Sequence, residues 1–357
     1  MNQINGLLLS ADTIIAEIKN NELKSINDNL LPLYLKRTGD IKGWLSIRSI
    51  DEHRANSRLL KKALRLSEKD DISTVLSVNA VTITDNYWFK ELDSDLTYND
   101  VKFKKNYFDK LALMGDVDSF NLPYSRTPEL TNTGSFEKCW RLENGKWWLY
   151  KQGNSNELFS ELFICKLGEA LGYKMAEYSL FDKYIRSEDF TQNATVNFES
   201  AYSLVGDNED YSYNYEVMKD ISNDIANEYV NLIALDTLCF NMDRHTHNYG
   251  FLRDVITGNI LRLAPNFDNN IALISRGYSK DISRDNDKLI SLFEEFIKEK
   301  QIVFSLPPLT KEIVKKIAGA ISIPNIDSEY VSMFIMNGYD KIQSINIEQT
   351  QSMEQTI

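Results

Sequence analysis

Three polar side chains in the second half of the chain have the types and the spacing needed to move a phosphoryl group. Asp243 is followed five positions later by Asn248, and Asp268 comes twenty positions after that. Phosphoryl transfer requires a carboxylate that faces the attacking oxygen and oxygen ligands that hold a metal ion on the phosphates. Magnesium prefers such ligands and usually keeps several waters. The spacing therefore predicts Asp243 as the catalytic base, with Asn248 and Asp268 as metal ligands.

The stretch between Asn248 and Asp268 has the composition of a β-hairpin. Residues 250–253 and 259–263 are predicted strands, and residues 254–258 join them with Gly258 at the turn. A hairpin that returns to its start would bring Asp268 back beside Asn248. The alternative is a polar loop whose Asp and Asn residues cap helices, since the D-x-x-x-x-N spacing alone is common by chance. The whole string of residues favours the phosphotransfer site over this alternative.

The string Asp-Arg-His-x-x-Asn at 243–248, the Gly-Phe-Leu strand after it and the later Phe-Asp resemble the HipA-like kinases and the phosphatidylinositol kinases. The resemblance to the HipA-like family covers about residues 125–300 and is strongest at 236–270. It implies an α+β, bilobal protein-kinase-like fold with a small β-rich N-lobe, a mostly helical C-lobe and an extra N-terminal subdomain. It also implies the base and metal-binding roles of Asp243, Asn248 and Asp268.

We expect four segments along the chain. They are an N-terminal subdomain (1–120), an N-lobe with a nucleotide-binding loop (121–200), a helical C-lobe with the catalytic and metal-binding loops (201–345), and a polar, Gln-rich tail (346–357) with the composition of a disordered segment. Within the first segment, residues 14–18 and 54–66 are predicted to be helical and residues 75–83 extended.

Residues 131–151 are predicted to bind the phosphates of ATP. Two strands are joined by a turn at 143–146, and the second, aromatic strand ends at Lys151. The loop before them places Gly134 among small hydroxyl residues, so backbone N–H groups and Ser135 can come close to phosphate. By resemblance, Lys151 is the phosphate-binding lysine of the third kinase strand, and the alternative is a surface lysine with its charge in solvent.

A helix is predicted to begin at Asn154, with Glu157 completing a capping box. Glu161 projects from the apolar face of this helix, where a carboxylate needs a partner. By resemblance the partner is Lys151, in the ion pair that fixes the phosphate-binding lysine. Glu157 is the competing candidate, but its capping position explains it fully.

Strands at 178–181 and 194–198 are expected to complete the N-lobe. The chain should then cross between lobes and offer backbone groups to adenine, with Glu199 and Ala201 as the binding positions. A helix over 222–240 should deliver the chain to Asp243. His245 matches a histidine common in this loop of the family, for which packing is favoured over direct chemistry. Only three histidines and no Cys-x-x-Cys or His-x-x-x-His spacing are present, which argues against a zinc site.

The amino-acid composition limits the binding partners and the cellular compartment that we expect for the protein. The chain has 40 Lys and Arg against 52 Asp and Glu, for a net charge of −12, which disfavours direct nucleic-acid binding or an anionic-membrane surface. The basic run at 54–69 alternates with leucines at helical spacing, as in an amphipathic helix with a solvated basic face. Three cysteines in apolar contexts suit reduced thiols in the cytoplasm, and we predict neither a signal peptide nor a membrane span.

The resemblance implies an ATP- and Mg²⁺-dependent serine/threonine kinase with a protein substrate. HipA proteins are toxins bound by a DNA-binding antitoxin, so an antitoxin partner is implied, and secreted relatives leave a non-classical export route open. HipA-like kinases also phosphorylate a Ser of their own loop, which indicates Ser135 or, failing that, Thr133.

Two other classes of function compete with this interpretation. A kinase of a small molecule or lipid headgroup is one, because phosphatidylinositol kinases share the Asp-Arg-His-x-x-Asn loop. A non-enzymatic nucleotide-binding regulator is the other. The complete set of phosphotransfer residues argues against the regulator, since degenerate kinases usually lose one of them.

Overall fold

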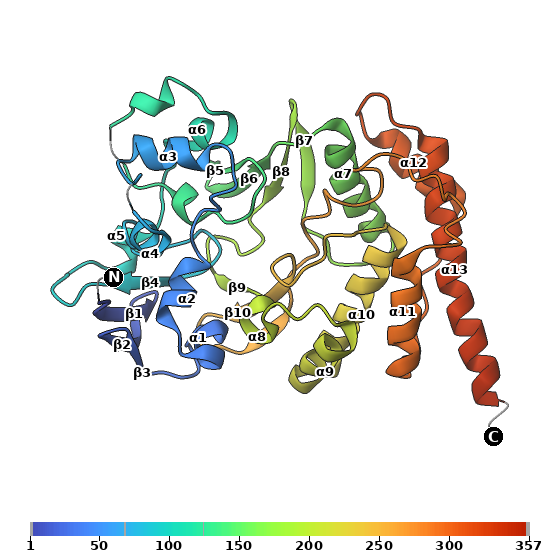
Figure 1. Ribbon diagram of the computed structural model, residues 1–357, viewed down its shortest axis with the longest axis horizontal. Coiled ribbons are helices and arrows are strands. Elements are labelled where there is room, and N and C mark those ends of the chain that lie inside the picture. The colour runs from blue at the N-terminus through green and yellow to red at the C-terminus, as the bar shows by residue number, and fades with distance from the viewer. Residues whose placement is uncertain (1–2, 68, 124, 355–357) are drawn as a thin grey trace. The chain divides into compact units, whose positions relative to one another are not determined.

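Antiparallel sheets and helices make up the chain, so the protein belongs to the α+β class, as predicted (Figure 1). The computed structural model describes residues 3–67, 69–123 and 125–354. The chain divides into two units. The first contains Met1–Gln152, Ser179–Gly206 and Gly250–Leu261, and the second contains Gly153–Tyr178, Asp207–Tyr249 and Arg262–Ile357. Within the described residues, no helix has both the length and the apolar character needed to cross a membrane.

The N-terminal part of the first unit contains a four-stranded antiparallel sheet. Its strand order is β3 (Glu22–Ser25), β2 (Thr13–Lys19), β1 (Gly6–Ser10) and β4 (Tyr87–Lys90). Helices α1 (Leu33–Thr38), α2 (Ile41–Ser46) and α4 (Asp71–Leu76) contribute to the core that this sheet buries. Leu8, Ile15, Leu35, Trp44 and Val75 lie in that core.

Two secondary-structure predictions for this region are wrong. The helix predicted at 14–18 is strand β2, which pairs with β1 on one side and β3 on the other. Three of its residues are β-branched isoleucines, which favour a strand over a helix. The extended segment predicted at 75–83 begins instead with the last turn of α4, whose N-cap Asp70 accepts a hydrogen bond from the Ser73 N–H.

A second sheet in the first unit has the order β5 (Lys138–Glu143), β6 (Lys146–Lys151), β8 (Tyr184–Glu188) and β7 (Tyr178–Phe181). The strand–turn–strand predicted before Lys151 is therefore confirmed, whereas β8 was not predicted. Helix α3 (Ser57–Ala63) lies between β3 and β4 in the chain. Four short elements lie between β4 and β5: α5 (Tyr98–Val101), α6 (Asp109–Met114), η1 (Ser119–Asn121) and η2 (Pro128–Thr131).

The third sheet contains the strand predicted at 194–198, which begins at Val196. Strand β9 (Val196–Ser200) pairs with β10 (Gly250–Asp254), which is followed by β11 (Ile260–Leu263) in the order β11-β10-β9. The predicted hairpin is thus confirmed, with Gly258 at φ +74° in its turn. Helix α8 (Tyr202–Val205) follows β9.

The second unit is helical around α10 (Asn223–Leu238), which confirms the helix predicted over 222–240. Helix α10 contacts α9 (Tyr211–Ile221), α11 (Lys288–Glu299) and α13 (Ser328–Glu354). Figure 1 shows α9 and α11 beside α10. Helix α7 (Ser155–Ala170) has the predicted capping box of Asn154 and Glu157, and it contacts α12 (Lys311–Ala320). Helix α13 continues to Glu354, where the sequence predicts a disordered tail, and residues 355–357 lie outside the described residues.

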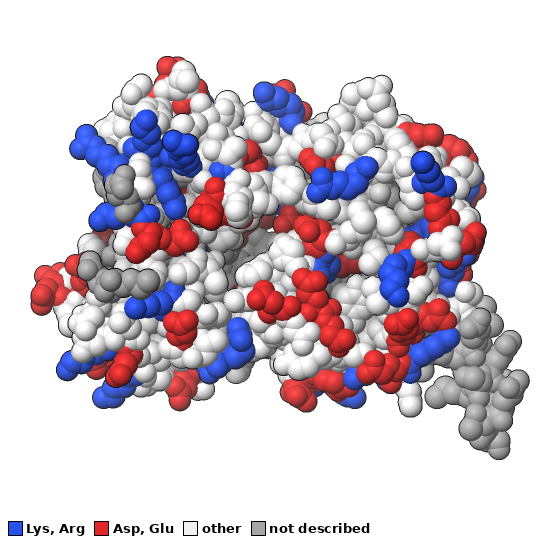
Figure 2. All heavy atoms as spheres, viewed as in Figure 1, with Lys and Arg blue, Asp and Glu red and all other residues white. Residues whose placement is uncertain are grey.

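The basic run at 54–69 has two different parts. Lys and Arg side chains gather over α3 in Figure 2, where Arg58 and Lys62 are exposed and Leu60 is buried, as an amphipathic helix requires. Arg54, at the start of the run, is instead only 1% exposed. The predicted solvated face therefore does not include Arg54.

Candidate active site

The loop that follows α10 carries Asp243, and hydrogen bonds from its own residues hold it against the helix end. The Asn241 side chain donates to Asp236 Oδ1 of α10 at 2.8 Å and accepts the Asp243 N–H at 3.1 Å. The Asn248 side-chain nitrogen donates to the Asp243 carbonyl at 3.0 Å. The two residues predicted as base and metal ligand are therefore tied together by the loop itself.

Arg244 connects this loop to the loop that carries Asp268. Its guanidinium is buried and forms two parallel hydrogen bonds with the Asp236 carboxylate, at 2.8 and 3.0 Å. Its Nη1 donates to the carbonyls of both Asn248 and Phe267. The Arg244 guanidinium therefore holds the carbonyl of Asn248, the first predicted metal ligand. It also holds the carbonyl of Phe267, which precedes Asp268, the second predicted ligand.

The second Arg244 nitrogen completes the same connection. Nη2 donates to Asn266 Oδ1 at 3.0 Å and to Asn269 Oδ1 at 2.7 Å, on either side of Asp268. The sequence interpretation quoted Arg244 only as part of the Asp-Arg-His string and assigned it no role. A signal was present, because an Arg between two functional polar residues and close to Asp236 can form a buried pair with it.

Asp268 lies in a backbone conformation that few residues adopt. Its φ is +63°, in the left-handed region where Asp and Asn are enriched among non-glycine residues. Its N–H donates to Tyr178 Oη at 3.3 Å, and the next N–H, that of Asn269, donates to Glu161 Oε1 at 2.8 Å. Glu161 is fully buried on α7, so its carboxylate supports the Asp268 loop.

Asn248 and Asp268 have the donor chemistry that suits magnesium. The Asn248 side-chain nitrogen is used in a hydrogen bond, which leaves the amide oxygen as the group able to face a cation. Together with the Asp268 carboxylate it supplies two hard oxygen ligands. In the described part of the chain, no group of three or more His, Cys, Asp and Glu side chains could hold a metal.

The environment of Asp243 makes its carboxylate more basic. Burial raises the pKa of Asp243, and the Asp268 charge raises it further, while His245, Arg244 and Arg276 oppose the shift. A raised pKa improves a general base, because its affinity for the proton it must accept increases. His245 Nδ1 accepts the His247 N–H at 3.3 Å, which agrees with a packing role for His245 in the loop.

The predicted phosphate-binding residues lie together in the first unit. Gly134 has φ +93°, and Thr133 and Ser135 beside it are exposed. Lys151 is directly opposite Lys138 in the β5–β6 pairing, and both lysines are buried. A Cβ added to Gly134 would clash with Lys138 Nζ, so this ammonium lies against the loop. Lys138, whose ammonium lies against the glycine loop, was missed by the sequence analysis.

Glu161 and Lys151 belong to different units, so the ion pair that the resemblance implies for them stays a prediction.

The positions predicted to bind adenine, Glu199 and Ala201, are part of the first unit. The Glu199 carboxylate is paired with Arg253 and also accepts hydrogen bonds from Tyr87 Oη at 3.0 Å and from the Leu33 N–H at 2.6 Å. Ala201 is buried and its carbonyl accepts the Leu204 and Val205 N–H groups. The Glu199 side chain thus has a structural role. The sequence analysis did not identify Arg253 as its partner.

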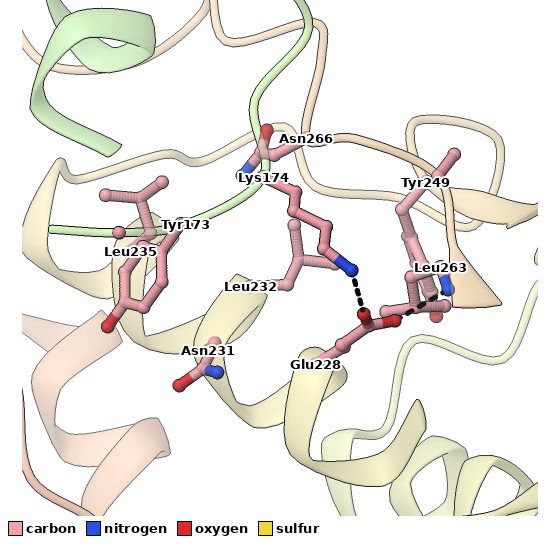
Figure 3. Close-up of a pocket in the computed structure, with 11 residues that line it drawn as sticks. Tyr173, Lys174, Glu228, Asn231, Leu232, Leu235, Tyr249, Leu263 and Asn266 are labelled. Carbon is pink, nitrogen blue, oxygen red and sulfur yellow. Dashed lines mark hydrogen bonds and ion pairs between the residues drawn. The ribbon is translucent and has the colours of Figure 1, made fainter. Parts of the chain in front are cut away.

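A cavity of about 180 Å³ lies elsewhere in the second unit (Figure 3). Glu228 of α10 lies on its wall, where it accepts hydrogen bonds from Lys174 Nζ at 3.2 Å and from the Leu263 N–H at 2.8 Å. Its apolar lining includes Leu232, Leu235, Leu263 and Ala264. Asp243, Asn248 and Asp268 do not line it, so the cavity is separate from the predicted chemistry.

Comparison with solved structures tests the predicted fold class. The chain is similar to the toxin in a complex of HipA, HipB and operator DNA from Shewanella oneidensis MR-1, with a TM-score of 0.59, 12% sequence identity, and coverage of 95% of this chain and 97% of that one. It is also similar to the Helicobacter pylori proinflammatory kinase CtkA, with a TM-score of 0.43, 18% identity, and coverage of 62% and 95%. A search of curated proteins finds no match. The predicted kinase-like fold class is confirmed.

The family follows from the sequence itself. Residues 128–323 match the model of the HipA-like C-terminal domain, which is more than half of the chain. The chain belongs to this family, and the resemblance drawn from the Asp-Arg-His string is confirmed.

Proposed function

We propose that this chain is an ATP- and Mg²⁺-dependent serine/threonine protein kinase of the HipA type. The observation that carries the proposal is the Arg244 network, which holds the loops of Asp243, Asn248 and Asp268 together through a buried guanidinium. A site for phosphoryl transfer needs these three groups held rigidly.

In the proposed reaction, the Asp243 carboxylate accepts the proton of a substrate hydroxyl. A bond forms between the hydroxyl oxygen and the γ-phosphorus of ATP, and the bond from that phosphorus to the bridging oxygen breaks, which releases ADP. Asn248 and Asp268 would hold Mg²⁺, which supplies charge neutralisation on the phosphates when bound. Lys138, Lys151 and the Gly134 loop would bind the phosphates, while the adenine contacts of Glu199 and Ala201 would be made by backbone groups.

The proposal includes a toxin role with an antitoxin as partner, in the cytoplasm. Its support is membership of the HipA-like family and similarity to a HipA that was solved with HipB and operator DNA. That complex gives no support to our expectation that this chain does not contact nucleic acid, which stays a prediction based on its net charge of −12.

The test of the activity uses purified protein with γ-labelled ATP, Mg²⁺ and a host-cell lysate. We expect label on protein Ser or Thr residues, lost when EDTA replaces Mg²⁺ and lost in the Asp243→Asn variant. Label on lipid or on a small metabolite alone would instead favour the alternative class of kinase. Equal labelling by the wild type and by Asp243→Asn would overturn the proposal.

We further expect autophosphorylation at Ser135 or, failing that, at Thr133. Both side chains are exposed in the loop, so either hydroxyl is accessible to a kinase. A phosphate there adds nearly two negative charges where the ATP phosphates would bind, so it should repel nucleotide and switch activity off. Mass spectrometry after incubation with ATP and Mg²⁺ tests this, with Asp243→Asn as the inactive control. If both hydroxyls stay unmodified in a demonstrably active protein, they serve only as small residues that allow close backbone approach.

A further inference from the structure

Arg54 makes an unusual set of contacts in the first unit. Its guanidinium is buried, and its Nη2 donates to three consecutive carbonyls, those of Asn132 at 2.5 Å, Thr133 at 3.2 Å and Gly134 at 3.0 Å. Its Nε also donates to the Gly134 carbonyl at 3.2 Å. A residue of the N-terminal segment, about 80 positions earlier in the sequence, therefore holds the backbone of the glycine loop.

These hydrogen bonds from Arg54 determine the direction in which the backbone N–H groups of the loop point. In a trans peptide the carbonyl and the following N–H point in opposite directions. Three carbonyls that face Arg54 therefore direct the N–H groups of Thr133, Gly134 and Ser135 away from it. Among the described residues these three N–H groups have no acceptor, and Thr133 and Ser135 are exposed. Successive N–H groups without an acceptor can each donate to an oxygen of a phosphate chain.

The charge of Arg54 is itself held by a buried carboxylate. Glu129 Oε2 lies 3.9 Å from Arg54 Nη1, and Glu129 also accepts hydrogen bonds from the Trp140 N–H at 2.7 Å and from Asn132 Nδ2 at 2.9 Å. Burial raises the pKa of Glu129 to about 7, and the Arg54 charge opposes that shift. Glu129 thus connects Arg54 to both the start of the loop and the strand after it.

We infer that Arg54 is a positioning residue for phosphate recognition: it orients the N–H groups of residues 133–135 toward the polyphosphate of a nucleoside triphosphate. The inference rests on the proposed function, because it requires that this loop binds ATP. It gives the N-terminal segment a role in nucleotide binding, although Arg54 itself faces the loop from behind and need not touch the nucleotide.

Arg48 provides a matched control for the test. It is also a buried arginine of the first unit, with two hydrogen bonds to the Ala80 carbonyl and a salt bridge to Asp85 at 2.8 Å. Arg48→Met therefore removes a comparable buried charge and its backbone contacts without touching the glycine loop. A general loss of stability should be common to Arg48→Met and Arg54→Met.

The experiment compares the binding of ATP and of adenosine, in the presence of Mg²⁺, by the wild type, Arg54→Met and Arg48→Met. For Arg54→Met we expect ATP affinity to fall about 10- to 100-fold, the effect of losing charge-assisted hydrogen bonds, with adenosine affinity unchanged within about twofold. For Arg48→Met we expect neither to change. Arg54→Lys, which keeps the charge but lacks the planar fork of donors, should show a smaller loss with the same selectivity and serves if Arg54→Met does not fold.

The outcomes separate this inference from the proposed function. If the wild type binds ATP and every folded Arg54 variant keeps its preference for ATP over adenosine, Arg54 does not position the loop and the kinase proposal stands. An equal loss of both ligands, matched by Arg48→Met, assigns Arg54 a purely structural role and also overturns the inference. If the wild type itself binds no ATP, both proposals fall.

Discussion

Replacing Asp243 with Asn is expected to reduce phosphotransfer by about 100- to 10,000-fold, the usual contribution of a general base, while the protein stays folded and still binds nucleotide. Asn has the same shape, and the N–H of residue 243 keeps its hydrogen bond to Asn241 Oδ1. Steady-state kinetics with labelled ATP measure the loss of kcat. Near-normal turnover of the variant would show that another group takes the proton.

The pKa of Asp243 adds two checks to this prediction. Because burial raises that pKa above its ordinary value of 3.8, the acid limb of the wild-type pH–rate profile should lie above that value. Asp243 therefore binds its proton more tightly in the folded state than in the unfolded state. Its contribution to the stability of the fold is lost as pH rises through the raised pKa. At pH 7, Asp243→Asn should therefore unfold at a temperature no lower than the wild type, which separates lost chemistry from lost structure.

Asp268→Asn provides the matched comparison. Asn tolerates the left-handed backbone at φ +63°, so the loop should keep its conformation. The metal-binding carboxylate is lost, so the gain in nucleotide affinity that Mg²⁺ confers over EDTA should shrink in Asp268→Asn and persist in Asp243→Asn. If both variants showed the same Mg²⁺ dependence as the wild type, the assignment of Asp268 as a metal ligand would be wrong.

Replacing Arg244 with Met is expected to destabilise the protein by about 3–5 kcal/mol and to abolish activity. The substitution leaves the Asp236 carboxylate, which is 3% exposed, without its cationic partner. Loss of one partner from a buried ion pair typically destabilises a protein by this amount. It also releases the carbonyls of Asn248 and Phe267, so the two loops lose their common anchor. Urea denaturation gives the change in the free energy of unfolding, and the labelled-ATP assay gives the activity.

Arg284 is the control for this prediction because it is another buried arginine of the second unit. It pairs with Asp287 at 2.7 Å and donates to the carbonyls of Thr237 and Leu238, and it makes no hydrogen bond to residues 241–249 or 266–269 in the described structure. Arg284→Met should be destabilising to a similar degree but should keep activity under conditions where it is folded. If both variants kept the same activity when folded, Arg244 would serve stability alone.

Local patterns in the sequence determined much of the candidate site. The D-x-x-x-x-N spacing, the hairpin with Gly258 at its turn and the capping box at Asn154 are all set within short stretches of chain. Hydrogen bonds from a cap or a turn link residues only a few positions apart, so composition and spacing are sufficient to predict them. The helix that leads to Asp243 follows from the same kind of evidence, because its apolar residues recur at helical spacing.

Tertiary structure decided which buried charges meet. Arg244 contacts residues 22 to 25 positions away, Arg54 contacts the glycine loop 78 to 80 positions away, and Glu199 is 54 positions from Arg253. The apolar run at 14–18 became a strand because β1 and β3 supply its hydrogen bonds, and β9 paired with β10 rather than with the sheet that contains Lys151. A buried ion needs a partner, but the sequence does not specify which one, because that depends on how distant segments pack.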